Sequence, residues 1–195
     1  MLYTGKGDNG RTGLFGCDQR MSKSSAIVEA LGSLDEINSL LGWCKVKAES
    51  GRAILVGRKK LSAVLAEVQD SLFSIQAELA GAPKRLSASV LRRTEKLIEA
   101  IEAELPPIKS FIVAGGTELA AILDVARTVS RRAERRAVLA CLPDRQTTES
   151  SAENLRVKLA PSTLAYLNRL SSLLYALARL VNHRAKVMER GPEYK

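Results

Sequence analysis

The segment LSAVLAEVQDSLFSIQAEL, residues 61–79, decides the fold class. Its apolar positions are spaced alternately by four and three residues: Leu61, Leu65, Val68, Leu72, Ile75 and Leu79. This alternation places them on one stripe of an amphipathic helix, as in antiparallel bundles that pack like short coiled coils. The segment stops near Gly81-Ala82-Pro83, where a helix is expected to end.

The same spacing recurs from Ala30 to Ala48 and from Leu167 to Val181. Two further helices are predicted, over about 87–105 and from a Thr117 N-cap to about 142. Loops are expected at about 49–56, 82–86, 106–116 and 143–160, with the last helix starting at Pro161 and residues 191–195 frayed. The sequence thus predicts an all-α five-helix bundle over 24–190.

Residues 1–23 differ from the rest, because glycines recur there every two or three residues and no apolar period of either kind survives. We expect a glycine-rich N-terminal arm. A chain of this length fits one domain or at most two small ones, and we expect arm and bundle to form a single domain, residues 1–195.

Composition excludes several function classes. The chain lacks the long uncharged run of a membrane helix and starts without an apolar signal core, so we expect a cytoplasmic protein that does not enter a membrane. Three cysteines without CxxC spacing disfavour a disulfide framework or a zinc ribbon. His183 is the only histidine in the sequence, so neither a histidine metal site nor a Ser-His-Asp triad is expected.

A net charge of +9 suits an anionic partner: nucleic acid, phosphates or an acidic surface. Only 4% of residues are aromatic, which leaves few platforms for stacking single-stranded bases. A phosphate ligand is therefore favoured over nucleic acid, with a basic RNA-binding helical module kept as an alternative.

The glycine-rich start is the first candidate site. Glycines let backbone N–H groups turn toward one point, and Lys6, Arg11 and Thr12 add charge and a hydroxyl, as in a phosphate cradle. The pattern is neither GxxxxGK[ST] nor GxGxxG after a strand. Composition alone favours a flexible arm.

The second candidate is ARTVSRRAERR, residues 126–136. On a helix, several of its charged residues and the preceding Asp124 fall close to one face: Asp124, Arg127, Arg131, Glu134 and Arg135. Arginines bind a triphosphate well because their guanidinium groups form bidentate contacts. The alternative is a solvated face joined by Arg–Glu pairs within the helix.

Three weaker candidates have equally plain structural alternatives. Asp35 and Asn38 lie one turn apart beside the apolar seam, and Asp35 could be a surface acid near a helix start. Asn168 either reads a ligand or sets bundle register. Phe111, in the loop before Gly115-Gly116, is in such a place most often a core anchor.

Taken together and in this order, the segments resemble the PduO-type ATP:cob(I)alamin adenosyltransferases. Six ordered elements carry the resemblance along nearly the whole chain: YTGKGDNG from Tyr3, Lys23, DEIN from Asp35, Phe111 to Gly116, ARTVSRRAER from Ala126, and YLNRLSS from Tyr166.

The resemblance implies a five-helix bundle that forms a homotrimer with active sites between subunits. It implies transfer of the 5′-deoxyadenosyl group from ATP, with Mg²⁺, to cob(I)alamin, giving adenosylcobalamin and triphosphate. A flavoprotein reductase and an adenosylcobalamin-dependent enzyme are the further partners it suggests. A non-catalytic nucleotide- or corrinoid-binding escort of the same fold is the alternative.

The resemblance also assigns residues. Its ATP contacts match Thr4, Gly5, Lys6, Gly7, Thr12, Gly13 and Lys23 on the arm, and Arg131, Arg132, Glu134, Arg135 and Asn168 on the helices. Its structural ion pair matches Asp35 with Arg127, expected to orient the arginine helix against the first helix. Phe111 matches the aromatic that occupies the lower face of the corrin and displaces the lower ligand. No residue is implied as a resident metal ligand.

This chain departs from the family pattern at several positions. Lys6 replaces a threonine, Ala114 the loop proline, Asp124 a histidine and Ser172 an aspartate, and one residue is extra around 16–18. Because Asp124 and Ser172 fall near the corrin region implied by the resemblance, corrinoid affinity is where this chain is expected to differ.

Overall fold

The structure, a computed structural model, describes residues 2–14, 20–142 and 158–194. Within these residues the chain forms five α-helices: α1 Ala26–Glu49, α2 Leu61–Leu79, α3 Ala88–Glu102, α4 Glu118–Cys141 and α5 Pro161–Arg184. The predicted all-α bundle is confirmed, and each helix begins and ends within a few residues of its expected position. No helix in the described ranges is long and apolar enough to cross a membrane.

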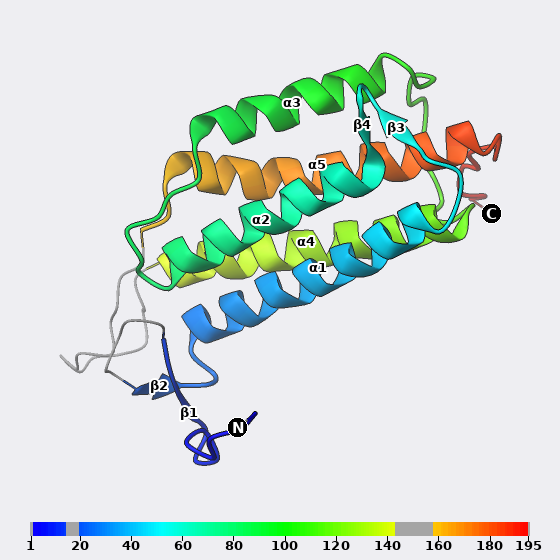
Figure 1. The fold of residues 1–195 in the computed structure, drawn as a ribbon. Helices are drawn as coiled ribbons and strands as arrows, with labels where there is room; N and C mark the ends of the chain where they lie inside the picture. Colours follow the sequence, from blue (N-terminus) through cyan, green and yellow to red (C-terminus); the bar gives the residue numbers. More distant parts are fainter. Residues whose placement is uncertain (1, 15–19, 143–157, 195) are drawn as a thin grey trace.

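The helices lie side by side along one common direction (Figure 1). α4 packs between α1 and α5, while α2 packs on α1 and α3 packs on α5. Neighbouring helices joined by short loops run antiparallel, as in the bundles whose apolar spacing these helices share.

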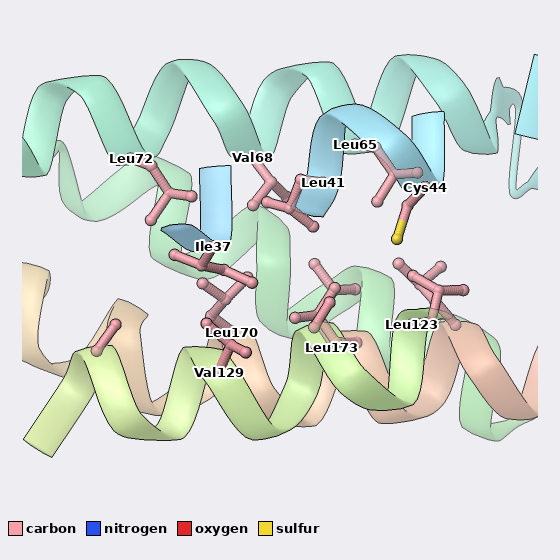
Figure 2. Close-up of a cluster of buried hydrophobic side chains, with 14 of the residues drawn as sticks. Ile37, Leu41, Cys44, Leu65, Val68, Leu72, Leu123, Val129, Leu170 and Leu173 are labelled. Carbon is pink, nitrogen blue, oxygen red and sulfur yellow. The ribbon is translucent and has the colours of Figure 1, made fainter. Parts of the chain in front are cut away.

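The apolar stripes of the helices meet in one core (Figure 2). Ile37 and Leu41 of α1 face Leu65 and Leu72 of α2, and Leu123 of α4 closes the core from below. Burial of each such side chain contributes about 1.5–3 kcal/mol. Cys44 lies in the same core, and its burial raises the pKa of the thiol to about 11.

Helix ends are satisfied by both local and distant groups. The expected N-cap of α4 is confirmed, since the Thr117 hydroxyl accepts a hydrogen bond from the Ala120 N–H. Ala160 at the start of α5 has no side-chain oxygen to do the same. There the buried Glu78 accepts from the Ala160 N–H and the Thr163 hydroxyl, both at 2.6 Å, and so joins α2 to α5.

Two small antiparallel hairpins were not predicted. Strands β1 Arg11–Gly13 and β2 Arg20–Ser22 pair within the arm, and β3 Leu55–Val56 pairs with β4 Lys59–Lys60 before α2. Strands of two or three residues are too short to display the alternation that identifies a strand in a sequence.

The chain reverses directly after α5, ahead of residues 191–195 for which fraying was expected. Lys186, at φ +58°, lets the chain reverse, with bonds from Lys186 N–H to the His183 carbonyl and from Val187 N–H to the Asn182 carbonyl. The reversed chain then meets the loop 106–116, where the Val113 N–H donates to the Arg190 carbonyl at 2.8 Å. The predicted loop at 143–160 lies mostly outside the described residues, as do Gly16 and Cys17.

Candidate functional site

The N-terminal arm folds into a tight loop over residues 5–10. The Asp8 N–H donates to the Gly5 carbonyl and the Gly10 N–H to the Gly7 carbonyl, each at 3.2 Å. Gly5 and Gly10 have φ values of +65° and +75°, a region that side-chain-bearing residues rarely adopt. The Lys23 N–H then closes the loop by donating to the Gly10 carbonyl at 2.9 Å.

Basic side chains surround this loop. The Lys23 ammonium lies so close to Gly7 that a Cβ on the glycine would be 3.1 Å from Nζ. The Arg20 guanidinium donates to the Lys6 carbonyl and, at 2.7 Å, to the Arg11 carbonyl. The structure therefore gathers all seven arm residues predicted to bind ATP in one basic loop and hairpin, and adds Arg20, which sequence analysis missed.

The arginines of α4 divide between two tasks. Arg132 pairs with Glu36, and Arg136 pairs with Glu29 at 2.6 Å and with the Ser33 hydroxyl at 2.7 Å, so both hold α4 to α1. Arg131 and Arg135 are exposed and form no ion pair within the described ranges. Hence most pairs reach another helix rather than staying within α4, and two guanidinium groups remain available.

Asn168, on α5, contacts the arginine-rich helix α4 through Glu134. Its amide donates to Glu134 at 3.0 Å and its oxygen accepts from Arg169 at 3.0 Å, while Arg169 also bonds Glu95 of α3 at 3.1 Å. The Asn168 side chain is exposed and held in one orientation by this chain of bonds. It is thus an oriented amide at the surface, not a registry residue inside the seam.

Phe111 lies in the loop before α4, and 80% of its surface is exposed. It is therefore not a core anchor of this chain. Gly115 near the end of the loop is fixed on both sides, because its N–H donates to Asp124 at 3.2 Å and its carbonyl accepts from Asn182 at 2.7 Å.

The arm and the Phe111 loop lie at opposite ends of the bundle (Figure 1). The arm and the hairpin β1–β2 precede the start of α1, near the end of α4, whereas the loop precedes the start of α4. α4 has 24 residues. Its length is therefore about 36 Å at 1.5 Å per residue, and this length separates the two regions within one chain.

Comparison with known proteins identifies the family of this chain. A family described as cobalamin adenosyltransferase matches residues 2–181. The chain belongs to the cobalamin adenosyltransferase family. It is 38% identical over 190 residues to a corrinoid adenosyltransferase of Bacillus subtilis, covering 95% of this chain and 89% of that protein.

Two further members of the family illustrate its range. A corrinoid adenosyltransferase PduO of Citrobacter freundii is 38% identical over 191 residues, and this chain spans about half of it, 50%. A variant of a PduO-type ATP:corrinoid adenosyltransferase from Lactobacillus reuteri, solved with cobalamin and ATP, superposes with a TM-score of 0.81 at 29% identity, covering 100% of both chains.

One expected contact of the cobalamin adenosyltransferase is not formed within this chain. Asp35 is exposed on α1, whereas Arg127 pairs at 3.5 Å with Asp124 one turn earlier on α4 and lies over the Tyr175 ring of α5. Arg127 thus faces α5. The pairs of Arg132 and Arg136, not an Asp35–Arg127 pair, orient α4 against α1.

The positions where this adenosyltransferase departs from the family pattern have different surroundings. Asp124 is mostly buried and holds both the Gly115 N–H and Arg127, so it supports the loop that carries Phe111. Ser172 and Ala114 are exposed, as is Lys6 on the arm. Sequence analysis singled out Asp124 but missed Asn182, because an asparagine near a helix end has no distinguishing pattern.

Proposed function

We propose that this chain transfers the 5′-deoxyadenosyl group of ATP to the cobalt of a reduced corrinoid. Cobalt(I) donates its electron pair to C5′, the C5′–O bond breaks, and triphosphate leaves with the bonding electrons. The cobalt–carbon bond that forms raises the formal oxidation state of cobalt to III. The observation that carries the proposal is that α4 carries two exposed arginines without an ion pair in the described ranges, Arg131 and Arg135, together with Glu134, which orients the amide of Asn168.

The reaction requires positive charge and correct positioning of the substrates from the protein, but no general base. Because cobalt(I) is itself the nucleophile, no group has to remove a proton. The leaving triphosphate is strongly anionic, and Lys6, Lys23 and Arg131 would neutralise it as charge develops. Backbone N–H groups of the glycine loop would add donors toward the same phosphates.

Mg²⁺ is expected to arrive as the complex with ATP. Among the described residues no group of three or more His, Cys, Asp or Glu side chains is placed to hold a metal ion. Phosphate oxygens and water are ordinary ligands of Mg²⁺ in nucleotide sites. The family resemblance thus implies MgATP as the substrate complex.

Phe111 is proposed to act on the other substrate. An exposed ring on a loop fixed at Gly115 presents an apolar surface to the corrin, in line with the role that the resemblance assigns to it. A ring seated against the lower face would displace the lower nitrogen ligand and leave four-coordinate cobalt(II), which is easier to reduce.

The active enzyme is proposed to be a homotrimer with sites between subunits. The arm that would bind ATP and the loop that would meet the corrin lie at opposite ends of one chain. A site that uses both therefore needs two copies, and a ring of three repeats one such contact around an axis.

The positive net charge further suits an acidic flavoprotein donor in the cytoplasm, with an adenosylcobalamin-dependent enzyme taking the product.

The deciding experiment is an anaerobic assay with MgATP and chemically reduced cobalamin, which follows loss of the cobalt(I) absorbance. We expect adenosylcobalamin from the wild type and a loss of about a hundredfold or more in Arg131→Ala, since one stabilising donor at a leaving anion contributes this much. Arg92→Ala is the matched control, because Arg92 is an exposed arginine on α3.

The outcomes separate the alternatives. Wild-type rates in Arg131→Ala would refute the assignment of the arginine. A folded wild-type protein that binds ATP and cobalamin but forms no product would favour the escort, and Asp124 and Ser172 would then be the first positions to revert to the family pattern.

A further inference from the structure

We infer that Asn182, on the last turn of α5, is a positioning residue that fixes the loop carrying Phe111. The inference rests on the proposed function, since it concerns the loop that would meet the corrin. Asn182 lies outside every motif that carries the family resemblance, and it touches the loop rather than the substrate.

Asn182 uses both ends of its amide on the loop. Its Nδ2 donates to the Gly115 carbonyl at 2.7 Å. Its Oδ1 accepts from the Thr117 N–H at 2.9 Å and from the Thr117 hydroxyl at 3.2 Å. One side chain therefore fixes the backbone on both sides of Gly116 and holds the residue that caps α4.

The absence of a side chain at Gly116 leaves room for the Asn182 amide. A Cβ at Gly116 would lie 2.5 Å from Oδ1 and 2.6 Å from Nδ2 of Asn182, which is closer than real Cβ atoms approach other atoms. Gly116 also has φ +100°, and Gly115 has φ +125° but open space where its Cβ would be. The two glycines thus separate the cost of the backbone conformation from the cost of displacing Asn182.

Few other contacts hold this loop. Arg179, one turn before Asn182, donates to the Pro106 carbonyl at 2.9 Å and to Glu189 at 2.8 Å. The Val113 N–H is held by the tail at Arg190. Residues 107–112, which lie between Pro106 and Val113, form no backbone hydrogen bond to other parts of the described chain. The position of Phe111 therefore depends on the contacts that hold the loop before and after this segment.

Loss of Asn182 is expected to free the loop without unfolding the bundle. Asn182 is half-buried at the end of α5 and is not one of the residues of the hydrophobic core. In Asn182→Ala the Thr117 N–H loses its acceptor and the Gly115 carbonyl its donor. Phe111 then samples more positions, and the step that needs it against the corrin slows.

The test compares five single variants with the wild type. Asn182→Ala and Gly116→Ala should act alike, because both remove the same contact. Gly115→Ala controls for backbone strain, and His183→Ala controls for a change on the same turn of α5, since His183 is exposed. Asn182→Asp keeps the acceptor for Thr117 and loses the donor to Gly115, so an intermediate effect is expected.

Each protein is measured by hydrogen exchange, thermal unfolding, the two activity assays and cob(II)alamin spectroscopy. Hydrogen exchange of the Thr117 amide should quicken about tenfold or more in Asn182→Ala and Gly116→Ala, with the melting temperature within a few degrees of the wild type. Turnover that starts from cob(II)alamin should fall about tenfold or more, whereas transfer to chemically prepared cob(I)alamin falls far less. The spectrum of four-coordinate cob(II)alamin should weaken in the same two variants.

The double variant Asn182→Ala/Gly116→Ala adds a coupling test. Because the collision of Gly116→Ala requires the Asn182 side chain, adding Gly116→Ala to Asn182→Ala should cost no more than the backbone strain that Gly115→Ala reports. Additive losses would overturn the inference. So would unchanged exchange at Thr117, or equal losses in the cob(II)alamin and cob(I)alamin assays.

The experiments distinguish failure of the proposed adenosyl transfer from failure of the positioning role of Asn182. Hydrogen exchange reports on the Asn182 contact without any corrinoid. A wild-type protein that forms no adenosylcobalamin would refute the proposed function, and a wild-type enzyme whose Asn182→Ala variant keeps full turnover from cob(II)alamin would refute the positioning role alone.

Discussion

At the scale of single residues, the buried thiol of Cys44 and the buried phenol hydroxyl of Tyr166 are expected to limit the stability of the fold at alkaline pH. Burial raises the pKa of Cys44 from 9.0 to about 11 and that of Tyr166 from 10.0 to about 12. The folded protein then holds both protons at pH values where the unfolded chain releases them. The stability that these groups contribute is present below about pH 9 and is lost as the pH rises toward 11 and 12.

Each group is expected to remove on the order of 2–3 kcal/mol of unfolding free energy across its range, at about 1.4 kcal/mol per pKa unit. The measurement is urea unfolding at a series of pH values from 8 to 11. Tyr166→Phe and Cys44→Ala should each flatten the fall, whereas Tyr3→Phe should not, because Tyr3 is exposed. An equally steep fall in all variants would contradict the assignment.

At the scale of elements, Glu78 is expected to hold the start of α5 on the end of α2. Its carboxylate accepts from the Ala160 N–H and the Thr163 hydroxyl and lies near the positive end of the α5 dipole. Glu78→Ala leaves the buried Thr163 hydroxyl and the half-buried Ala160 N–H without an acceptor and should lower the unfolding free energy by about 2–4 kcal/mol. Glu78→Gln should cost less, because one amide oxygen still accepts.

The control for Glu78 is Glu99→Ala, an exposed glutamate on α3, with an expected change within about 0.5 kcal/mol. Chemical unfolding monitored by circular dichroism compares the three variants. A Glu78→Ala protein as stable as the Glu99→Ala protein would show that the α2–α5 contact contributes nothing to stability.

The elements also show what sequence could predict. The helices were predictable because Leu61 to Leu79 and its counterparts repeat at helical spacing over many turns. The hairpin β1–β2 was not, because three residues such as Arg11–Gly13 carry no period. The reversal after α5 was missed because it turns on Lys186 at positive φ, where glycine is the usual signal.

The candidate site was predictable in its residue types but not in all its pairings. The resemblance identified the arm, Arg131 and Asn168, which the structure places at the surface. It could not indicate that Arg127 pairs with Asp124 rather than Asp35, because an arginine on a helix has acids within reach both one turn away and on neighbouring helices. Nor could it identify Asn182, whose partners lie more than 60 residues away in sequence.

At the scale of the whole molecule, the separation of arm and loop predicts complementation between two defective chains. Lys23→Ala impairs the arm and leaves the loop intact, whereas Phe111→Ala does the reverse. If each site takes its arm from one copy and its loop from the next, some sites in a mixed trimer combine the intact arm of a Phe111→Ala copy with the intact loop of a Lys23→Ala copy.

Random assembly of equal amounts gives each half of a site an even chance of being intact, so roughly a quarter of the sites are whole. Co-expressed, differently tagged chains should therefore recover about a quarter of the wild-type turnover from cob(II)alamin, while each variant alone stays near zero. The control is a chain that carries both substitutions, co-expressed with either single variant, which restores no whole site. If one chain built its own site by bringing arm and loop together, the mixed trimers would recover nothing, and the opposite ends seen in Figure 1 would then have to approach each other in the working enzyme.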